Sequence, residues 1–294
     1  MDWQTRLVTT YLKVCNIFHQ HGFRFCLERM SNNGTVSLTD EEVLTVYLHG
    51  IMSHRRTLKS IYSFTSDHLG DWFPNLVTYE VFVRRINHMG EALPVFLEKL
   101  LETESNLEVR SRFKLMDSMP IVMAGSKRSN RAKVAPELAN KGFCATKNLY
   151  YYGVKLHVLG DDRDNTLPIP EYVGLTSASE HDLSAFKPIV GELYNKDIFC
   201  DKAYQDRDTQ IQLRRQGSDL VTPVKLKRGQ KRLDSTDKLY SAAVSSIRQP
   251  IESLFGWIQE KTGIECASKV RSYKGLMVHV FGRMAASVML MMGI

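Results

Sequence analysis

The sequence lacks the features of a secreted, disulfide-bonded or zinc-binding protein. Its five cysteines are odd in number, and no C-x-x-C pair occurs among them (Cys15, Cys26, Cys144, Cys200 and Cys266). A disulfide framework or a zinc knuckle needs paired, regularly spaced cysteines. The first residues do not have the pattern of a signal peptide. We therefore expect reduced thiols and a cytoplasmic protein.

Long apolar runs, internal repeats and low-complexity segments are also scarce. The most apolar stretch, residues 276–294, contains His279 and Arg283, and the part after Arg283 is too short to span a bilayer. A buried core helix is the favoured interpretation, and a membrane-associated protein is the alternative. With 294 residues and 43% hydrophobic content, the chain has enough apolar material for two folded domains.

Acidic residues are fewer than basic ones, and the net charge of +7 is unevenly distributed. Residues 1–110 hold 11 of the 39 basic and 13 of the 32 acidic residues, which leaves 28 basic and 19 acidic residues in 111–294. Basic residues gather in 112–155 and again in 225–232, where Lys227 and Arg228 lie. Such clusters attract a polyanion such as DNA. A solvated basic face is the alternative interpretation.

The hydrophobic pattern changes near residue 110. Before it, the pattern predicts helices at about 4–19, 57–69, 78–88 and 91–103, and another that opens with the capping box Thr39–Glu42. After it, strands are predicted at 113–116, 151–159, 167–174, 198–200 and 219–224, with helices near 181–194, 206–216, 237–261 and 273–292. We therefore predict an all-helical domain, 1–110, followed by an α/β domain, 111–294. Its mixed sheet flanked by helices matches a ribonuclease-H-like fold in element order.

The predicted helix 78–88 has a second interpretation as a DNA-reading element. It follows a turn at Pro74-Asn75, as the second helix of a helix-turn-helix does. Arg84 and Arg85 would then reach phosphates or base edges. They serve equally well as solubilising charges on an exposed face.

Three acidic residues stand where buried elements would present them to a common centre. Asp117 closes the apolar run 112–117, Asp201 closes the run 197–201, and Glu252 lies in the helical stretch 245–257. A buried carboxylate is costly unless positive charge meets it. Carboxylates that converge bind Mg²⁺ or Mn²⁺, and two such ions about 4 Å apart assist a phosphodiester displacement. The pattern predicts a two-ion site that cuts nucleic acid.

The helix of Glu252 contains a proline. Its apolar stripe continues past Pro250, so either one helix bends here or a new helix begins with Pro250 in its first turn. Arg248 lies four residues before Glu252 and shares its face if the helix is continuous. An Arg–Glu surface pair is the plain alternative.

Five segments together resemble the DDE transposases of bacterial insertion sequences, most closely insertion-sequence family 982. They are Leu115–Pro120, Tyr152–His157, Cys200–Tyr204, Ile247–Trp257 and Ala267–Gly275. The resemblance runs from about 113 to 285 and implies a ribonuclease-H-like catalytic core. It implies that Asp117, Asp201 and Glu252 are the metal-binding triad of an enzyme that cuts at the ends of an element. Ser245 and Gln259 depart from related groups, which carry Tyr and Lys there, and this bears on how the flanking strand is held.

The mechanism assigns roles to these residues. We expect Asp117 to bridge both ions, with Asp201 on one and Glu252 on the other, and Arg248, Lys155 and Lys202 to hold phosphates. Each of these three cations is alternatively a mere neighbour of the site. A histidine acting as general base is unnecessary beside a hydrated metal ion. His157 is therefore not assigned the role of a base, and a structural role is favoured for His181.

The expected partners are double-stranded DNA, as terminal inverted repeats and as target, and a second copy of the chain assembled on that DNA. Three further alternatives remain at this point. The chain is a nuclease without strand transfer, a non-catalytic DNA-binding descendant of a transposase, or a protein that acts on RNA.

Overall fold

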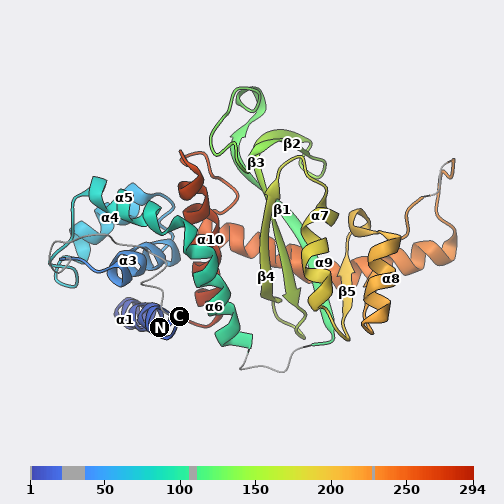
Figure 1. Ribbon diagram of the computed structural model, residues 1–294, viewed down its shortest axis with the longest axis horizontal. Coiled ribbons are helices and arrows are strands. Elements are labelled where there is room, and N and C mark those ends of the chain that lie inside the picture. Colours follow the sequence, from blue (N-terminus) through green and yellow to red (C-terminus); the bar gives the residue numbers. More distant parts are fainter. Residues whose placement is uncertain (1, 22–36, 106–110, 227–228) are drawn as a thin grey trace. The chain divides into compact units, whose positions relative to one another are not determined.

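The computed structural model describes residues 2–21, 37–105, 111–226 and 229–294. It divides into two compact units, and Figure 1 labels most of their helices and strands. The helical unit comprises residues 1–104, 134–137 and 258–294. The sheet unit comprises residues 105–133 and 138–257. The C-terminal residues thus group with the N-terminal helices, and these units do not coincide with a division of the chain at residue 110.

The helical unit contains each helix that the N-terminal sequence pattern predicts. Its elements in the described residues are α1 (Trp3–Gln20), α3 (Asp40–Met52), α4 (Leu58–His68), α5 (Tyr79–His88), α6 (Leu93–Ser105) and α10 (Tyr273–Met291). The predicted capping box is present, because the backbone N–H of Glu42 donates to the Thr39 hydroxyl over 3.1 Å. This cap satisfies donors that the first turn of α3 leaves free.

Helix α10 is the core element of this unit, as the sequence predicts. Every residue from Leu276 to Met289 is buried. Its Gly282 gives room for the Tyr47 ring of α3, whose hydroxyl donates to the carbonyl of Val278 over 2.9 Å. Among the described residues no helix is both long and apolar enough to cross a membrane.

The sheet unit is built on a mixed sheet. Its strands are β1 (Phe113–Gly125), β2 (Asn140–Cys144), β3 (Leu149–Asp161), β4 (Ile169–Ser177), β5 (Asp197–Cys200) and β6 (Asp219–Val221). Strand β3 pairs antiparallel with β1 on one edge and with β2 and β4 on the other. On the far side of β1, β5 and then β6 run parallel to it. Strand β3 therefore has partners on both sides, and its residues are almost continuously buried.

Strand β1 is much longer than the predicted segment 113–116, and the expectation that Asp117 ends it is wrong. Its whole length pairs with β3, as far as Gly125 opposite Tyr151. Of the residues of β1, only 113–116 pair with β5. Pro120 is tolerated because it lies beyond β5, where β1 has no partner on that edge. Strand β2 is a further element that the sequence pattern did not reveal.

Helices cover both faces of the sheet (Figure 1). Helices α7 (Asp182–Phe186) and α8 (Arg207–Arg215), with the 3₁₀ segment Lys187–Glu192, bury one face in an apolar core around Met116, Ile198 and Tyr204. The predicted helix 181–194 is thus α-helical only in its first turn, and Pro188 stands where the 3₁₀ geometry begins.

The opposite face carries α9 (Ser235–Thr262), a single continuous helix with Pro250 in its interior. Of the two interpretations left open by the sequence, one helix is therefore correct. Its residues Ile251 and Leu254 are fully buried. Continuity keeps Arg248 and Glu252 one turn apart on the same face.

Candidate active site

Asp117 and Asp201 are neighbours across the parallel pair of β1 and β5. Met116 is the register partner of Cys200, and the two aspartates are the next residues along each strand. Asp201 is the first residue after β5, and its Oδ1 accepts a hydrogen bond of 2.7 Å from the backbone N–H of Lys202. Parallel strands bring equivalent positions to one edge of the sheet, so this register explains why the two acids meet.

Helix α9 brings Arg248 and Glu252 to the same place. The Nη1 atom of Arg248 lies 2.8 Å from Oδ2 of Asp117, and its Nη2 atom lies 2.7 Å from Oε1 of Glu252. The Arg248 side chain is 14% exposed, against 57% for Glu252. Arg248 therefore joins the strand acid to the helix acid, and the plain alternative of an Arg–Glu surface pair does not describe it.

Burial and the neighbouring charges together determine the pKa of Asp117. The pKa of Asp117 is raised from 3.8 to about 6, chiefly because its carboxylate is buried. Arg248 and the backbone N–H of Ser118 lower the pKa, while the charges of Asp201 and Glu252 raise it again. All three acids therefore act on one electrostatic centre, although they come from β1, the end of β5 and α9.

The donor set has the chemistry of a divalent-cation site. Within the described residues no group of three or more His, Cys, Asp and Glu side chains is arranged so that it could hold a metal ion. The carboxylates of Asp117 and Glu252 instead face the guanidinium of Arg248. Carboxylate oxygens are nevertheless the ligands that Mg²⁺ and Mn²⁺ prefer, and a cation is what would lower the raised pKa of Asp117. In charge and in ligand type, the three acids fit such an ion.

Buried polar side chains from β3, β4 and the segment after Asp201 contact one another. His157 of β3 is fully buried, with Nε2 2.8 Å from the Thr176 hydroxyl and Nδ1 3.4 Å from the Tyr204 hydroxyl. Burial lowers the pKa of His157 to about 4, and the nearby Asp182 opposes this shift only partly. The imidazole of His157 is therefore neutral, and it is enclosed by protein.

Tyr204 and Thr176 are site-supporting residues that sequence reasoning missed. Burial raises the pKa of Tyr204 well above its ordinary value, and a hydrogen bond to the Ser118 side chain opposes the shift. Ser118 follows Asp117 directly, so this contact connects these buried side chains to the acid. One signal was present in the sequence, because Tyr204 and His157 lie in two of the five segments that carry the family resemblance.

The predicted phosphate contacts of the sheet unit are found in different settings. Lys202 is exposed beside Asp201. Lys155 forms an ion pair of 2.9 Å with Asp182. Lys114, one of the basic residues in the cluster 112–155, is buried and paired with Asp161 and Glu171. Part of this cluster therefore balances internal acids rather than facing a ligand.

The remaining predicted DNA contacts also differ from one another. Arg84 is exposed on α5, whereas Arg85 is only 11% exposed and forms a 2.7 Å ion pair with Asp40. Lys227 and Arg228 lie outside the described residues. His181 accepts a hydrogen bond of 3.3 Å from the backbone N–H of Leu183 at the start of α7, which is the structural role expected for it.

Comparison with known proteins identifies one family. The family model described as a transposase DDE domain matches residues 110–289, which is more than half of the chain. No curated protein and no solved structure matches the sequence.

Proposed function

Because the chain belongs to the transposase DDE domain family, we propose that it is a DNA transposase of the insertion-sequence family 982 type, which binds the ends of its element, cleaves them and joins them to a target. The observation that carries this proposal is the double ion pair of Arg248 with Asp117 and Glu252 beside Asp201. This double ion pair joins Asp117 of β1 to Glu252 of α9, and Asp201 follows the strand that pairs with β1 at this point.

The topology of the sheet supports a ribonuclease-H-like fold. Strands β1, β3 and β4 form an antiparallel set, and β5 and β6 continue the sheet in parallel on the other side of β1. Helix α9 then brings Glu252 back to β1. This order is the one expected of that fold, and it explains how acids far apart in the sequence act at one point.

In this proposal Asp117, Asp201 and Glu252 would hold the two divalent ions, Mg²⁺ or Mn²⁺, on which the reaction depends. Such ions supply an activated water and offset the charge that develops on the phosphate. The chain's own contribution is positional. Arg248 holds Asp117 and Glu252 in place. The Tyr204 hydroxyl, which contacts His157, also hydrogen-bonds with Ser118 and so supports β1 next to Asp117. Lys202 is exposed beside Asp201, and we expect it to contact a phosphate of the bound strand.

Assembly follows from the reaction. Joining two element ends in one event needs two such centres, so we expect the chain to act as a homodimer on DNA that carries both terminal repeats. We expect this in the cytoplasm, where cysteines such as Cys144, Cys200 and Cys266, which form no disulfide among the described residues, remain reduced.

The test compares Asp201→Asn with the wild type and with Asp219→Asn. Asp219 undergoes the same chemical change at an exposed position on β6. The substrate is labelled DNA carrying the genomic repeat that adjoins the coding sequence, with Mg²⁺ or Mn²⁺. We expect metal-dependent nicking at the repeat boundary that falls about a hundredfold or more in Asp201→Asn and is unchanged in Asp219→Asn.

The products separate the alternatives. Joined products with target DNA support a transposase, and cleavage without joining identifies a nuclease. Specific binding with no cleavage by the wild type would identify a non-catalytic descendant. Nicking by Asp201→Asn at the wild-type rate would remove Asp201 from the site.

A further inference from the structure

The helical unit contains a cavity of about 610 Å³ whose charge is of one sign. Five of its lining side chains are basic, and none of the described lining residues is Asp or Glu. The basic residues are Arg56, Lys59, Lys269, Arg271 and Arg283. Its volume lies within the range of small-molecule sites. An acid-free lining of this kind favours an anionic occupant.

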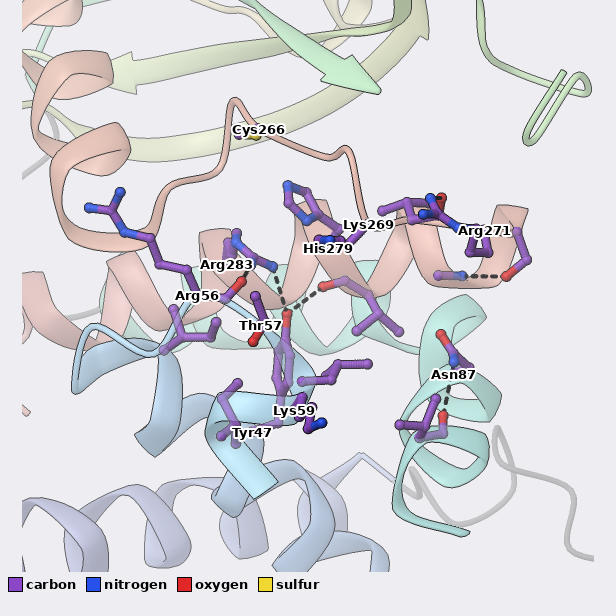
Figure 2. A pocket seen from close by; sticks show the side chains of 18 of the residues that line it. Tyr47, Arg56, Thr57, Lys59, Asn87, Cys266, Lys269, Arg271, His279 and Arg283 are labelled. Carbon is purple, nitrogen blue, oxygen red and sulfur yellow. Dashed lines mark hydrogen bonds between the residues drawn. The ribbon is translucent and has the colours of Figure 1, made fainter. Parts of the chain in front are cut away.

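The buried charge of Arg283 is energetically unfavourable, and a bound anion would offset this cost. Its side chain is buried, at 6% exposure, yet within the described parts of the chain its guanidinium donates only to neutral oxygens. They are the carbonyls of Thr262 and Arg56, at 3.1 and 2.7 Å, and the Tyr47 hydroxyl at 3.3 Å. Figure 2 shows Tyr47 of α3 reaching this guanidinium on α10. A buried cation without a counter-charge is unfavourable, so the cavity is electrostatically incomplete as it stands.

Two helices add to the positive potential. Thr57 is the N-cap of α4 and Ser272 is the N-cap of α10, and both line the cavity. Helix N-termini carry partial positive charge and bind phosphate. Ser272 also belongs to the segment Ala267–Gly275, which carries part of the family resemblance and has no place in the cleavage site.

The rest of the wall is apolar and aromatic. Tyr79 and Val83 of α5, Ile61 of α4 and Val278 of α10 line it, and Asn87 adds an amide. A small inorganic anion would leave this surface without a partner. An anion with a planar, partly apolar group would cover it. The lining thus combines positive charge, which binds a phosphate, with an apolar and aromatic surface, which binds a nucleotide base.

We propose that this cavity binds a nucleotide, with its phosphate against the cations and its base against the apolar wall. Two sources supply this chemistry, a free mononucleotide or one nucleotide of a DNA strand. The inference depends on the helical unit alone and not on the cleavage proposed above.

The test measures binding by the full-length chain in a chelator, so that cleavage plays no part. The probes are dAMP, a 5′-phosphorylated tetradeoxynucleotide, deoxyadenosine and inorganic phosphate, titrated by calorimetry. The cavity variant is Lys59→Ala with Lys269→Ala. Both side chains are exposed and make no hydrogen bond or ion pair within the described part of the chain. Its control is Arg55→Ala with Lys99→Ala, which removes the same charge from the same unit outside the cavity.

We expect the cavity variant to bind dAMP or the oligonucleotide about tenfold more weakly, and the control to bind within about twofold of the wild type. Phosphate and deoxyadenosine should each bind at least about tenfold more weakly than the nucleotide. Binding of the oligonucleotide but not of dAMP would identify a DNA strand as the source and would still support the site.

Cys266 provides an independent readout, because it lines the cavity and is exposed. Its alkylation by N-ethylmaleimide, followed by peptide mass mapping, should slow when the nucleotide binds, and Cys144 should be unaffected. The proposal is overturned if neither nucleotide probe binds, or if both variants bind equally. It is also overturned if phosphate binds as tightly as dAMP, or if Cys266 is not protected. DNA nicking by the sheet unit is measured in a separate experiment. A failure of nucleotide binding therefore overturns only the cavity proposal, and a failure of nicking overturns only the proposed cleavage.

Discussion

At the scale of single residues, Asp117 is held in a state that costs stability. Its carboxylate is 19% exposed, and burial raises its pKa to about 6 despite the Arg248 guanidinium 2.8 Å away. An acid whose folded-state pKa is raised favours folding when it is protonated. Its favourable contribution is present below the unfolded value of 3.8 and is lost as the pH rises through about 6. Near neutral pH, the ionised carboxylate of Asp117 therefore destabilises the fold, and a bound cation would offset this cost.

Asp117→Asn tests this strain. In a chelator at pH 8, the variant should have a higher free energy of unfolding than the wild type, by at most about 3 kcal/mol. The gain should shrink as the pH falls towards 4, because the wild-type carboxyl is then protonated too. Urea unfolding at several pH values measures it. A variant that is less stable at pH 8, or a difference independent of pH, would contradict this account and would show that the Arg248 pair outweighs the cost of burial.

At the scale of elements, the close contact of α3 with α10 depends on a glycine, Gly282, whose lack of a side chain leaves room for Tyr47. A Cβ atom on Gly282 would lie 2.5 Å from the ring of Tyr47, closer than real Cβ atoms approach. Gly282→Ala should therefore destabilise the chain by about 1–3 kcal/mol, as overpacking of a core does.

A matched control for Gly282→Ala lies in α9. Gly256 is also helical, and a Cβ atom there would meet no atom within 4 Å. Gly256→Ala should stabilise the chain by about 0.5–1 kcal/mol, because alanine loses less backbone freedom than glycine on folding. Thermal unfolding of both variants measures the pair. Equal effects of the two changes would mean that α3 and α10 do not pack closely at Gly282.

The elements also show what the sequence can and cannot predict. Helices with caps and one apolar stripe were predicted well, because their pattern is local, and the box Thr39–Glu42 is an example. The length of β1 was not predicted, because a proline such as Pro120 normally interrupts a strand. Pro120 is tolerated here because β1 has no partner strand on one side at that position, and only the assembled sheet shows this. The sequence singled out Asp117 and Asp201 because each closes an apolar run, and Glu252 because it lies beside a helical stripe; that the three hold metal ions stays a prediction. The double contact of Arg248 and the contact of His157 with Tyr204 depend on tertiary packing.

At the scale of the whole molecule, three buried histidines determine how the fold responds to acid. Burial lowers the pKa of His49 and His157 to about 4 each, and it lowers the pKa of His279 well below its ordinary value. Each contributes stability that is present above the unfolded value of 6.5 and is lost as the pH falls through the folded one. His49 and His279 lie in the helical unit. His157 lies in the sheet unit with Asp117, whose protonation has the opposite effect.

The two units should therefore differ in acid sensitivity. At pH 5 each buried histidine costs up to about 2 kcal/mol, while Asp117 returns about 1 kcal/mol to the sheet unit. Hydrogen exchange followed by mass spectrometry at pH 7.5 and pH 5, corrected for the intrinsic rate, should show a larger loss of protection in α3 and α10 than in β1 and β3. His279→Gln, in which an amide can still donate to the carbonyl of Ile264, should reduce that loss. If β1 and β3 lose as much protection as α10, or if His279→Gln leaves the pH response unchanged, then the buried histidines do not control acid unfolding. The cost would then lie in the ion pairs of the sheet unit, such as that of Lys114 with Asp161.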